Sequence, residues 1–201
     1  MLPAVKANAV VFTARNTVSY QEVDCPDPGV DDIVVDVTHS WISNGTEGSF
    51  LRGERIAGDT PWRSGDPDPF PIVAGYQKVG RVTWVGGDVT DYTVGETVFA
   101  TMGAVNGMFS PRGGQISPSI AIGGLWKLPE GHDPLKFSGL VLTQVGYNCG
   151  TRPPIESGEP AIVIGDGLVG QWAAQTLAWR GANVMLIGRH EDRLKRFNQG
   201  E

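Results

Sequence analysis

The chain has 201 residues, of which 40% are hydrophobic and 19% are charged, and its formal net charge is −6 at pH 7. This length allows one or two domains with a buried core, and the net negative charge gives no attraction to nucleic acid or to an anionic membrane. No apolar run reaches the ~20 residues that span a bilayer, the N-terminus lacks a signal-peptide pattern and there are only two cysteines, so we expect a reduced, cytoplasmic protein.

The first forty residues predict β-structure. Residues 5–13 and 18–23 have the composition of two strands joined by a polar turn at Arg15 and Asn16. Residues 33–38 predict a third strand with partial alternation of apolar and polar side chains.

A helix start and a loop follow this strand. Asn44 to Glu47 predicts the start of a short helix, with Asn44 as the N-cap and Glu47 three residues later in a capping-box relation. Residues 54–68 are polar and rich in Gly and Pro, and they predict a surface loop near the active site.

The clearest pattern in the chain is a strand, a glycine motif, a helix and a second strand. Ala161–Ile164 predicts a buried parallel strand, and residues 183–187 predict its neighbour. Between them, apolar residues recur at helical intervals from Leu168 to Ala178, and Gly181 follows where a C′ glycine belongs. Three glycines with G-x-G-x-x-G spacing join the first strand to this helix: Gly165, Gly167 and Gly170.

This motif predicts a dinucleotide site. The first glycine makes the tight turn, the second lets the backbone approach a pyrophosphate, and the third packs the helix on the strand. The diphosphate then meets the free N–H groups at the helix start, around Leu168 and Val169. An empty turn is the alternative, because a chain with 28 glycines matches the motif by chance more easily. Asp166 inside the motif would repel a diphosphate unless its side chain turns away.

The end of the second strand predicts which dinucleotide binds. An NAD site usually has Asp or Glu there, which accepts a hydrogen bond from the ribose 2′-hydroxyl. This chain has Gly188, followed by Arg189, His190 and, one helical turn later, Arg193. Guanidinium groups without a neighbouring acid suit a 2′-phosphate, so the pattern favours NADP(H). The alternative is that both arginines are solvated surface charges.

Motifs in the middle of the chain identify a family. Residues 69–86 read PFPIVAGYQKVGRVTWVG and residues 87–99 read GDVTDYTVGETVF. They resemble P-x-x-x-G-H-E-x-x-G-x-V and V-G-x-x-V-x-x-x-x-x-G-D-x-V of the medium-chain dehydrogenase/reductase superfamily. Residues 114–131 resemble the final barrel strand of that family and its K-x-P-x-G exit, and residues 137–148 resemble the helix that leads to the nucleotide domain.

The resemblance implies a fold of the α/β plus β class. Residues 1–132 would form a GroES-like barrel-type catalytic domain, and residues 133–201 the first βαβ portion of a Rossmann domain. A complete Rossmann domain has about six parallel strands, and this chain supplies two. We therefore expect a truncated chain, and a homodimer when the protein is complete.

The resemblance also bears on metal binding, because most members of the family hold a catalytic zinc. The family's C-G-T-D matches residues 44–47, so Asn44 replaces the cysteine ligand, and G-H-E matches residues 75–77, so Tyr76 replaces the histidine. The third ligand falls near Val141. An amide, a phenol and an alkyl group are not a zinc site, and two cysteines cannot form the family's four-cysteine structural zinc lobe. We predict no zinc.

Residues 42–47 together with Gly75 and Tyr76 resemble the zinc-less branch of the family that includes bacteriochlorophyllide dehydrogenase. The resemblance implies that Tyr76 donates a proton and that Thr46 relays it, with Ser43 and His39 as further members of the relay. The alternatives are that Tyr76 fills the space of the missing metal and that His39 is structural.

These observations predict a zinc-independent oxidoreductase that transfers a hydride between NADP(H) and an alcohol or ketone. Within enzymes, the alternative is an NADPH-dependent quinone or enoyl reductase. Outside enzymes, the alternative is a truncated remnant that binds a nucleotide without catalysis.

Overall fold

The computed structural model describes residues 6–197 and divides the chain into two compact units, with the division between Gly139 and Leu140. The sequence placed this boundary earlier, after residue 132. Residues 133–139 belong to the first unit because the short 3-10 helix η1 (Pro134–Phe137) packs on its strands β7 (Lys78–Val85) and β8 (Thr97–Ala104). No helix within the described range is long and apolar enough to cross a membrane.

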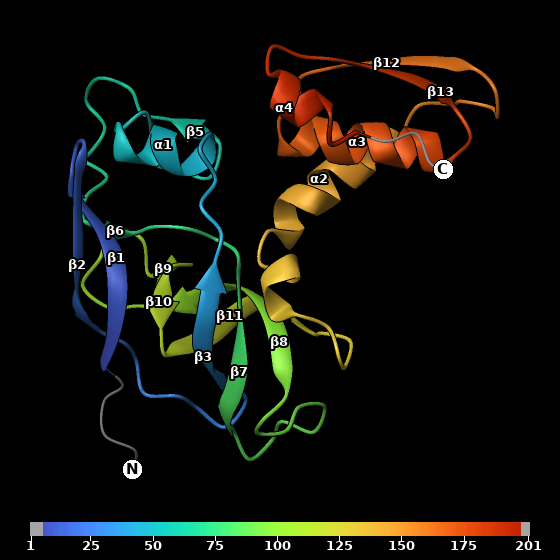
Figure 1. The fold of residues 1–201 in the computed structure, drawn as a ribbon. Helices are drawn as coiled ribbons and strands as arrows, with labels where there is room; N and C mark the ends of the chain where they lie inside the picture. Colours follow the sequence, from blue (N-terminus) through green and yellow to red (C-terminus); the bar gives the residue numbers. More distant parts are fainter. Residues whose placement is uncertain (1–5, 198–201) are drawn as a thin grey trace. The chain divides into compact units, whose positions relative to one another are not determined.

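The first unit is mostly β-structure (Figure 1). Besides β7, β8 and η1, its elements are β1 (Lys6–Ala14), β2 (Thr17–Asp24), β3 (Ile33–Ser40), α1 (Thr46–Leu51), β4 (Arg55–Ala57), β5 (Thr60–Pro61), β6 (Ile72–Val73), β9 (Arg112–Gly113), β10 (Ile116–Ser117) and β11 (Ser119–Lys127).

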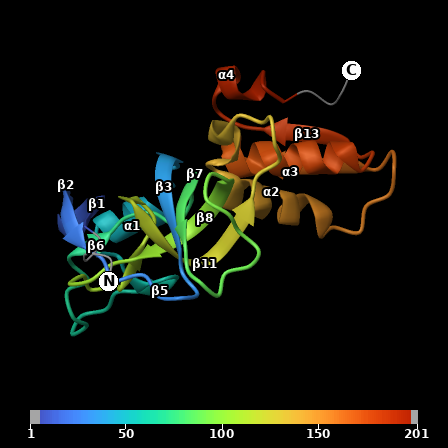
Figure 2. The ribbon, with the colours of Figure 1, turned by 90° about the horizontal axis from the view of Figure 1, so that it is seen from below.

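One sheet closes on itself. Its strand order is β11-β3-β7-β8-β9, and β11 also pairs with β8, so that β3, β7, β8 and β11 form a ring (Figure 2). A cluster of branched apolar side chains fills this part of the unit: Ile33, Val35, Val82 and Val98. The predicted barrel-type domain is confirmed by this closure.

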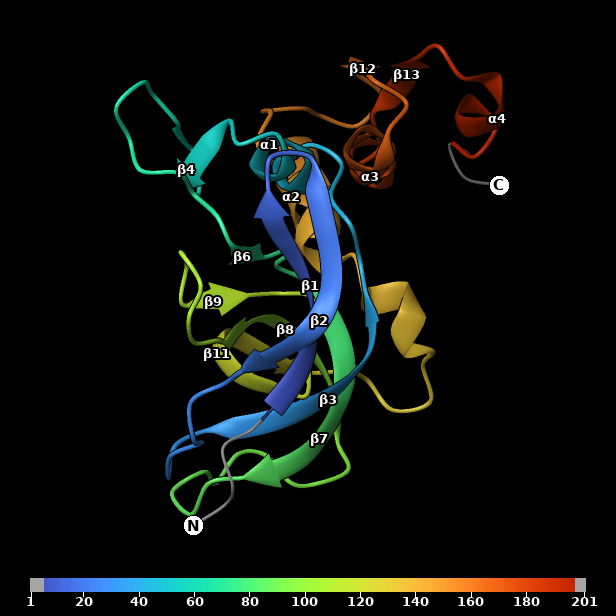
Figure 3. The same cartoon turned by 90° about the vertical axis from the view of Figure 1, so that its left-hand side faces the viewer.

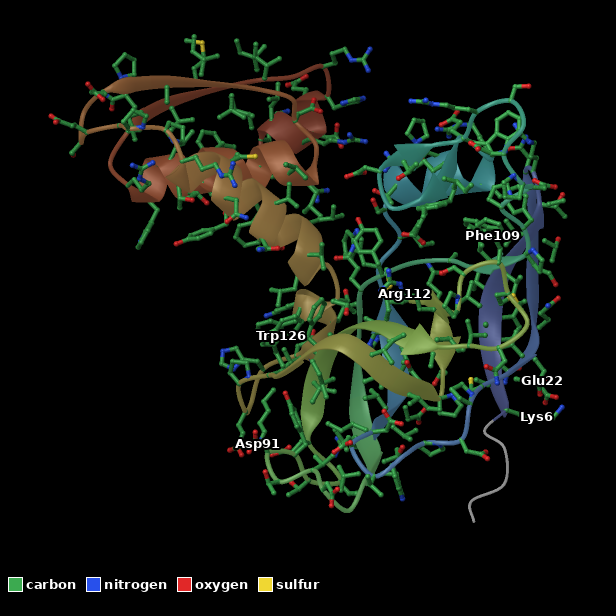
Figure 4. All side chains as sticks on the ribbon, turned by 180° about the vertical axis from the view of Figure 1, so that it is seen from behind. Lys6, Glu22, Asp91, Phe109, Arg112 and Trp126 are labelled. Atoms are coloured by element: carbon green, nitrogen blue, oxygen red, sulfur yellow. The ribbon has the colours of Figure 1, made fainter. Side chains whose placement is uncertain are left out.

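The other sheet is built around the β1–β2 hairpin (Figure 3), and β1 also pairs with β10 and β6. Alternation along β1 buries Ala7, Ala9 and Val11, as expected for a strand with one face on the core. At the open end of the hairpin, Lys6 Nζ lies 2.6 Å from Glu22 Oε1, and both residues are labelled in Figure 4. This ion pair is exposed and contributes little to stability.

The predicted helix start is shifted. α1 has Gly45 as its N-cap and no side-chain cap, so the prediction of Asn44 as N-cap is wrong. Glu47 still folds back on the chain, but its Oε2 accepts from the backbone N–H of Ser43 at 2.5 Å, one residue before the predicted partner. The carboxylate thus fixes the approach to the helix and does not form the predicted capping box.

The predicted loop 54–68 contains a short hairpin, in which β4 pairs with β5. Trp62 Nε1 donates to the carbonyl of Pro67 at 3.2 Å, and the Arg15 guanidinium lies 4.9 Å above the Trp62 ring. The loop is therefore tied both to itself and to the β1–β2 turn, which the polar composition did not indicate.

The second unit is a βαβ unit with two more helices. It contains α2 (Leu140–Thr151), β12 (Pro160–Ile164), α3 (Leu168–Trp179), β13 (Asn183–Ile187) and α4 (Glu191–Leu194), and β12 and β13 pair in parallel. The predicted strands and the helix between them are confirmed, but the first strand is not buried as predicted, because Ile162 and Ile164 are exposed on the face that α3 does not cover. Gly181 has φ +90°, as a C′ glycine requires.

α3 covers one face of this two-stranded sheet and packs on α2 with its other side. Gly146 and Gly150 of α2 allow this close approach, since a Cβ at Gly146 would lie 2.5 Å from Trp172 Cβ. The opposite sheet face is apolar and exposed, and it carries Ile162, Ile164, Met185 and Ile187.

Candidate cofactor site and catalytic residues

The glycine motif forms a tight turn between β12 and α3. Gly165 has φ +123°, a backbone conformation that side chains rarely adopt, and its N–H donates to the carbonyl of Ile187 at 2.8 Å. A Cβ at Gly170 would overlap the carbonyl oxygen of Gly165. Both glycines are thus required by the backbone, in the roles that the motif predicted for the first and third positions.

The same turn leaves room for a ligand. A Cβ built at Gly165 or Gly167 would meet no atom within 4 Å, and Gly167 is the N-cap of the twelve-residue α3. The first N–H groups of a helix, here around Leu168 and Val169, have no partner within the helix and favour an anion. The residues present fit the diphosphate of a dinucleotide.

Asp166 turns away from this turn. Its Oδ2 accepts from the backbone N–H of Arg189 at 2.8 Å and of His190 at 2.6 Å, and both oxygens lie 3.0 Å from His190 Nδ1. The hydrogen bond from the His190 side chain, followed by those from the backbone, lowers the pKa of Asp166 to about 2. The carboxylate that the sequence analysis regarded as an obstacle to the diphosphate is therefore held at the end of β13.

The residues predicted to bind the adenosine ribose or its 2′-phosphate lie at and after the end of β13. A Cβ at Gly188 would overlap the Asp166 side chain, so a larger residue there would displace that carboxylate. Arg189 is exposed directly after it, and Arg193 Nη1 in α4 lies 3.9 Å from Asp166 Oδ1. The structure brings Gly188, Arg189 and Arg193 together around Asp166.

The catalytic candidates lie in the first unit, on two segments that Gln115 connects. Glu47 is 4% exposed, and its Oε1 accepts a short hydrogen bond from Gln115 Nε2. Burial raises the pKa of Glu47. Gln115 in turn packs over Gly75, where a Cβ would lie 2.6 Å from Gln115 Cγ. The start of α1 and the loop that carries Tyr76 are thus held by one side chain, which sequence reasoning did not identify.

The four predicted relay members differ in exposure. Thr46 at the first position of α1 and Tyr76 between β6 and β7 are half-buried, Ser43 is buried, and His39 on β3 is exposed with Nδ1 3.2 Å from Thr38 Oγ1. Across residues 6–197, no hydrogen bond joins these four side chains to one another. Their catalytic roles stay a prediction.

The donor groups do not suit a zinc ion. The resemblance assigns Asn44 and Tyr76 to two of the family's ligand positions and a place near Val141 to the third, and the part of the chain that is described contains no group of three or more His, Cys, Asp or Glu that could hold a metal. Cys25 is buried, Cys149 is exposed, and both are free thiols. Zinc prefers Cys, His and carboxylate ligands that converge on one point.

One buried cation was not predicted. Lys78, which begins β7, is fully buried, and its Nζ donates to Ser119 Oγ at 2.7 Å. Burial lowers the pKa of Lys78 to about 7. No local pattern predicts this burial, because Lys78 follows another polar residue, Gln77, which is also buried.

Known proteins resemble both the sequence and the fold. No protein-family model matches the chain. A 2-desacetyl-2-hydroxyethyl bacteriochlorophyllide A dehydrogenase of Cereibacter sphaeroides is 32% identical over 98 residues, which cover 47% of this chain and 27% of that protein. The protein of the same name in Rhodobacter capsulatus is 26% identical over 191 residues, which cover 90% and 56%. The chain thus matches about a quarter to a half of the length of these curated relatives.

The solved structures extend the comparison to nearly the whole chain. An oxidoreductase/dehydrogenase of unknown specificity from Escherichia coli has a TM-score of 0.78 at 19% identity, covering 97% of this chain and 61% of its own. The 2R,3R-butanediol dehydrogenase of Bacillus subtilis has a TM-score of 0.75 at 18% identity, covering 94% and 60%. This chain therefore has the fold of the medium-chain dehydrogenase/reductase superfamily, a GroES-like domain with part of a Rossmann domain, and its sequence resembles the bacteriochlorophyllide dehydrogenases of that superfamily.

Proposed function

We propose that this chain belongs to a zinc-independent oxidoreductase that transfers a hydride between NADP(H) and an alcohol or ketone. The observation that carries the proposal is the end of β13, where Gly188 leaves room for Asp166 and where the backbone N–H of Arg189 and the guanidinium of Arg193 approach that carboxylate. Guanidinium groups bind phosphate, and the acid that would read a ribose hydroxyl is missing from the strand itself.

The glycine turn supports the cofactor part of the proposal. Gly165 and Gly170 shape it, and the N-terminus of α3 offers N–H groups to a diphosphate. When bound, the dinucleotide supplies or accepts the hydride. The residues of this chain would bind NADP(H) and discriminate against NAD(H).

The chemistry on the substrate falls to side chains of the first unit. Reduction of a carbonyl builds negative charge on oxygen, which a hydrogen-bond donor must stabilise where no metal does. Tyr76 has a phenolic O–H, is half-buried and stands at a former ligand position, so it is the proposed donor. Thr46, Ser43 and His39 are the proposed relay, and the Glu47–Gln115 hydrogen bond holds their segment against the Tyr76 loop.

Tyr76→Phe tests the donor, since it keeps the ring and removes the hydroxyl. General acid catalysis contributes about 10²–10⁴-fold, so we expect turnover to fall by at least ~10²-fold with unchanged cofactor affinity. Tyr20→Phe is the matched control, because Tyr20 is exposed on β2. Unchanged turnover in Tyr76→Phe would make Tyr76 a packing residue. Elemental analysis that finds about one zinc per chain in dialysed protein would contradict the proposal that the enzyme works without zinc.

The quinone or enoyl reductase is the second candidate function. It uses the same metal-free scaffold, and the lack of converging metal ligands in the described residues suits it equally well. A quinone oxidoreductase of Pseudomonas syringae shares the fold, with a TM-score of 0.66 at 21% identity. Oxidation of NADPH by quinones but not by ketones would favour this candidate, and no turnover with either would favour the nucleotide-binding remnant.

A further inference from the structure

Asp166 makes several polar contacts with the segment that follows β13. The residue is 7% exposed, although it lies in a loop, and its oxygens accept two backbone N–H groups and the Nδ1–H of His190. Arg193 Nη1 lies 3.9 Å from Oδ1 and adds a positive charge on that side. These contacts fix the chain at Arg189 and His190 directly after β13.

The same contacts exclude one role for Asp166. A carboxylate has about four lone-pair sites, and Oδ2 alone accepts from two backbone N–H groups and lies within reach of the imidazole. It is therefore poorly placed to act as the free acceptor for a ribose 2′-hydroxyl, which is what the acid of an NAD site does. Its charge faces a histidine and an arginine of the protein.

His190 is oriented by this arrangement. Its Nδ1 donates to Asp166, so Nε2 lies on the far side of the ring, and the side chain is 42% exposed. The backbone that follows is also anchored, because Gln171 Nε2 in α3 donates to the carbonyl of Arg193 at 2.7 Å. The partly exposed His190 ring thus follows Arg189 and precedes Arg193 by three residues, on a segment held at both ends.

We propose that Asp166 and His190 act as a pair in which Asp166 positions His190 as a third ligand for the adenosine 2′-phosphate, alongside Arg189 and Arg193. The inference rests on the proposed NADP(H) function and adds a specificity-determining residue to it. With Nδ1–H committed to Asp166, a charged imidazole donates its Nε2–H to the phosphate, whereas a neutral one offers only a lone pair there. The interaction therefore belongs to the protonated ring.

The other charges around this ring do not cancel the effect. Glu191 and Asp192 begin α4 directly after His190, and Glu191 is paired with Lys195, whose Nζ lies 2.8 Å from Glu191 Oε1. Asp192 is exposed and its charge is screened by solvent. Among the described residues, the contacts also place Asp166, Arg189 and Arg193 at this strand end.

The test compares two small probes, adenosine 2′,5′-bisphosphate and 5′-AMP, which differ only in the 2′-phosphate. Their dissociation constants are measured by calorimetry on the 201-residue chain at about pH 6, where histidine is commonly charged. A hydrogen bond to a charged group is stronger than one between neutral groups, so His190→Ala should lower the affinity for the bisphosphate about tenfold or more and leave the affinity for 5′-AMP unchanged. Arg152→Ala removes an exposed charge elsewhere in the unit and should change neither constant.

Asp166→Asn tests the positioning role. It should lower the preference for the bisphosphate in the wild-type background and have a clearly smaller effect on it when His190 is already alanine, because only the contacts of Asp166 with Arg189 and Arg193 then remain. Equal weakening of both probes by His190→Ala, or no weakening, would overturn the inference. If the wild-type chain binds both probes equally, the NADP(H) function fails as well. If it prefers the bisphosphate and His190→Ala keeps that preference, only the His190 role fails.

Discussion

The two compact units bury their sheets in different ways. In the first unit, β3, β7, β8 and β11 close into a ring, and the chain even encloses a lysine and a glutamate, Lys78 and Glu47. In the second unit, α3 covers one face of the β12–β13 pair, and the other face exposes large apolar side chains such as Ile164, which is 83% exposed.

The two units also differ in how far apart their candidate functional residues lie in the sequence. In the second unit the cofactor residues are consecutive in sequence, since a turn, a helix start and a strand end all follow local patterns. In the first unit the important contacts join distant positions, as between Gln115 and Glu47 or between Lys78 and Ser119. Closed packing is therefore where a change of charge should have the largest effect.

Lys78→Met should cause the largest change, and the quantity that changes is the pH dependence of the free energy of unfolding. The folded protein holds the pKa of Lys78 at about 7, against 10.5 for an ordinary lysine, so between these values the unfolded chain binds a proton that the folded chain lacks. Stability of the wild type should thus rise with pH across this window, by at most about 1.4 kcal/mol per pH unit.

The methionine variant removes this titration while it keeps an unbranched side chain. Denaturant unfolding between pH 7 and about 10 should show a flatter pH dependence for Lys78→Met than for the wild type. Lys127→Met is the matched control, because Lys127 is half exposed and paired with Glu96 at 2.7 Å. Parallel curves for Lys78→Met and wild type would mean that the buried amine is compensated within the barrel.

The uneven covering of the β12–β13 sheet predicts an intermediate effect. Val184 is 3% exposed under α3, and Val184→Ala removes two methyl groups, which should cost about 2 kcal/mol of unfolding free energy. Ile164→Thr on the open face should stay within about 0.5 kcal/mol and should lower binding of a hydrophobic dye. If thermal unfolding shows equal losses for both variants, the outer face is covered by another part of the protein or by a partner.

The smallest effect is expected from Asp166→Asn in acid. The pKa of Asp166 is lowered from 3.8 to about 2, chiefly by the His190 side chain, so its contribution to stability is present above about pH 4 and is lost as pH falls toward 2. The hydrogen-exchange protection factors of the segment from β13 to α4 should therefore fall less steeply with decreasing pH in Asp166→Asn than in the wild type. An identical fall in variant and wild type would show that these hydrogen bonds do not stabilise the strand end.

The sequence predicted the order of elements well where the pattern is local. Residues 183–187 form the predicted strand, and Gly165, Gly170 and Gly181 have the conformations or close contacts that their motif positions require. The strand-like composition on both sides of the polar turn at Arg15 and Asn16 also predicted the β1–β2 hairpin.

The rest depended on contacts that no local pattern encodes. Glu47 was interpreted as a helix cap, but its carboxylate bridges Ser43 and Gln115, which is 68 positions away in the chain. Asp166 was interpreted as an electrostatic obstacle, because nothing in the glycine motif shows that the end of β13 supplies three N–H donors to it. This contact also bears on the cofactor prediction, because Gly188, which was interpreted as the absence of a ribose-binding acid, leaves the space that the Asp166 carboxylate occupies.

The most direct test of the central claim is the cofactor preference itself. Dissociation constants of NADPH and NADH are measured by fluorescence titration at low and high salt, for the wild type and for Arg189→Ala. We expect the wild type to bind NADPH more tightly than NADH by about one to two orders of magnitude, and Arg189→Ala to lose most of this preference. High salt should reduce the preference of the wild type only partly. Equal affinity of the wild type for NADPH and NADH at low salt would contradict the account, because Arg189 and Arg193 would then be ordinary surface charges.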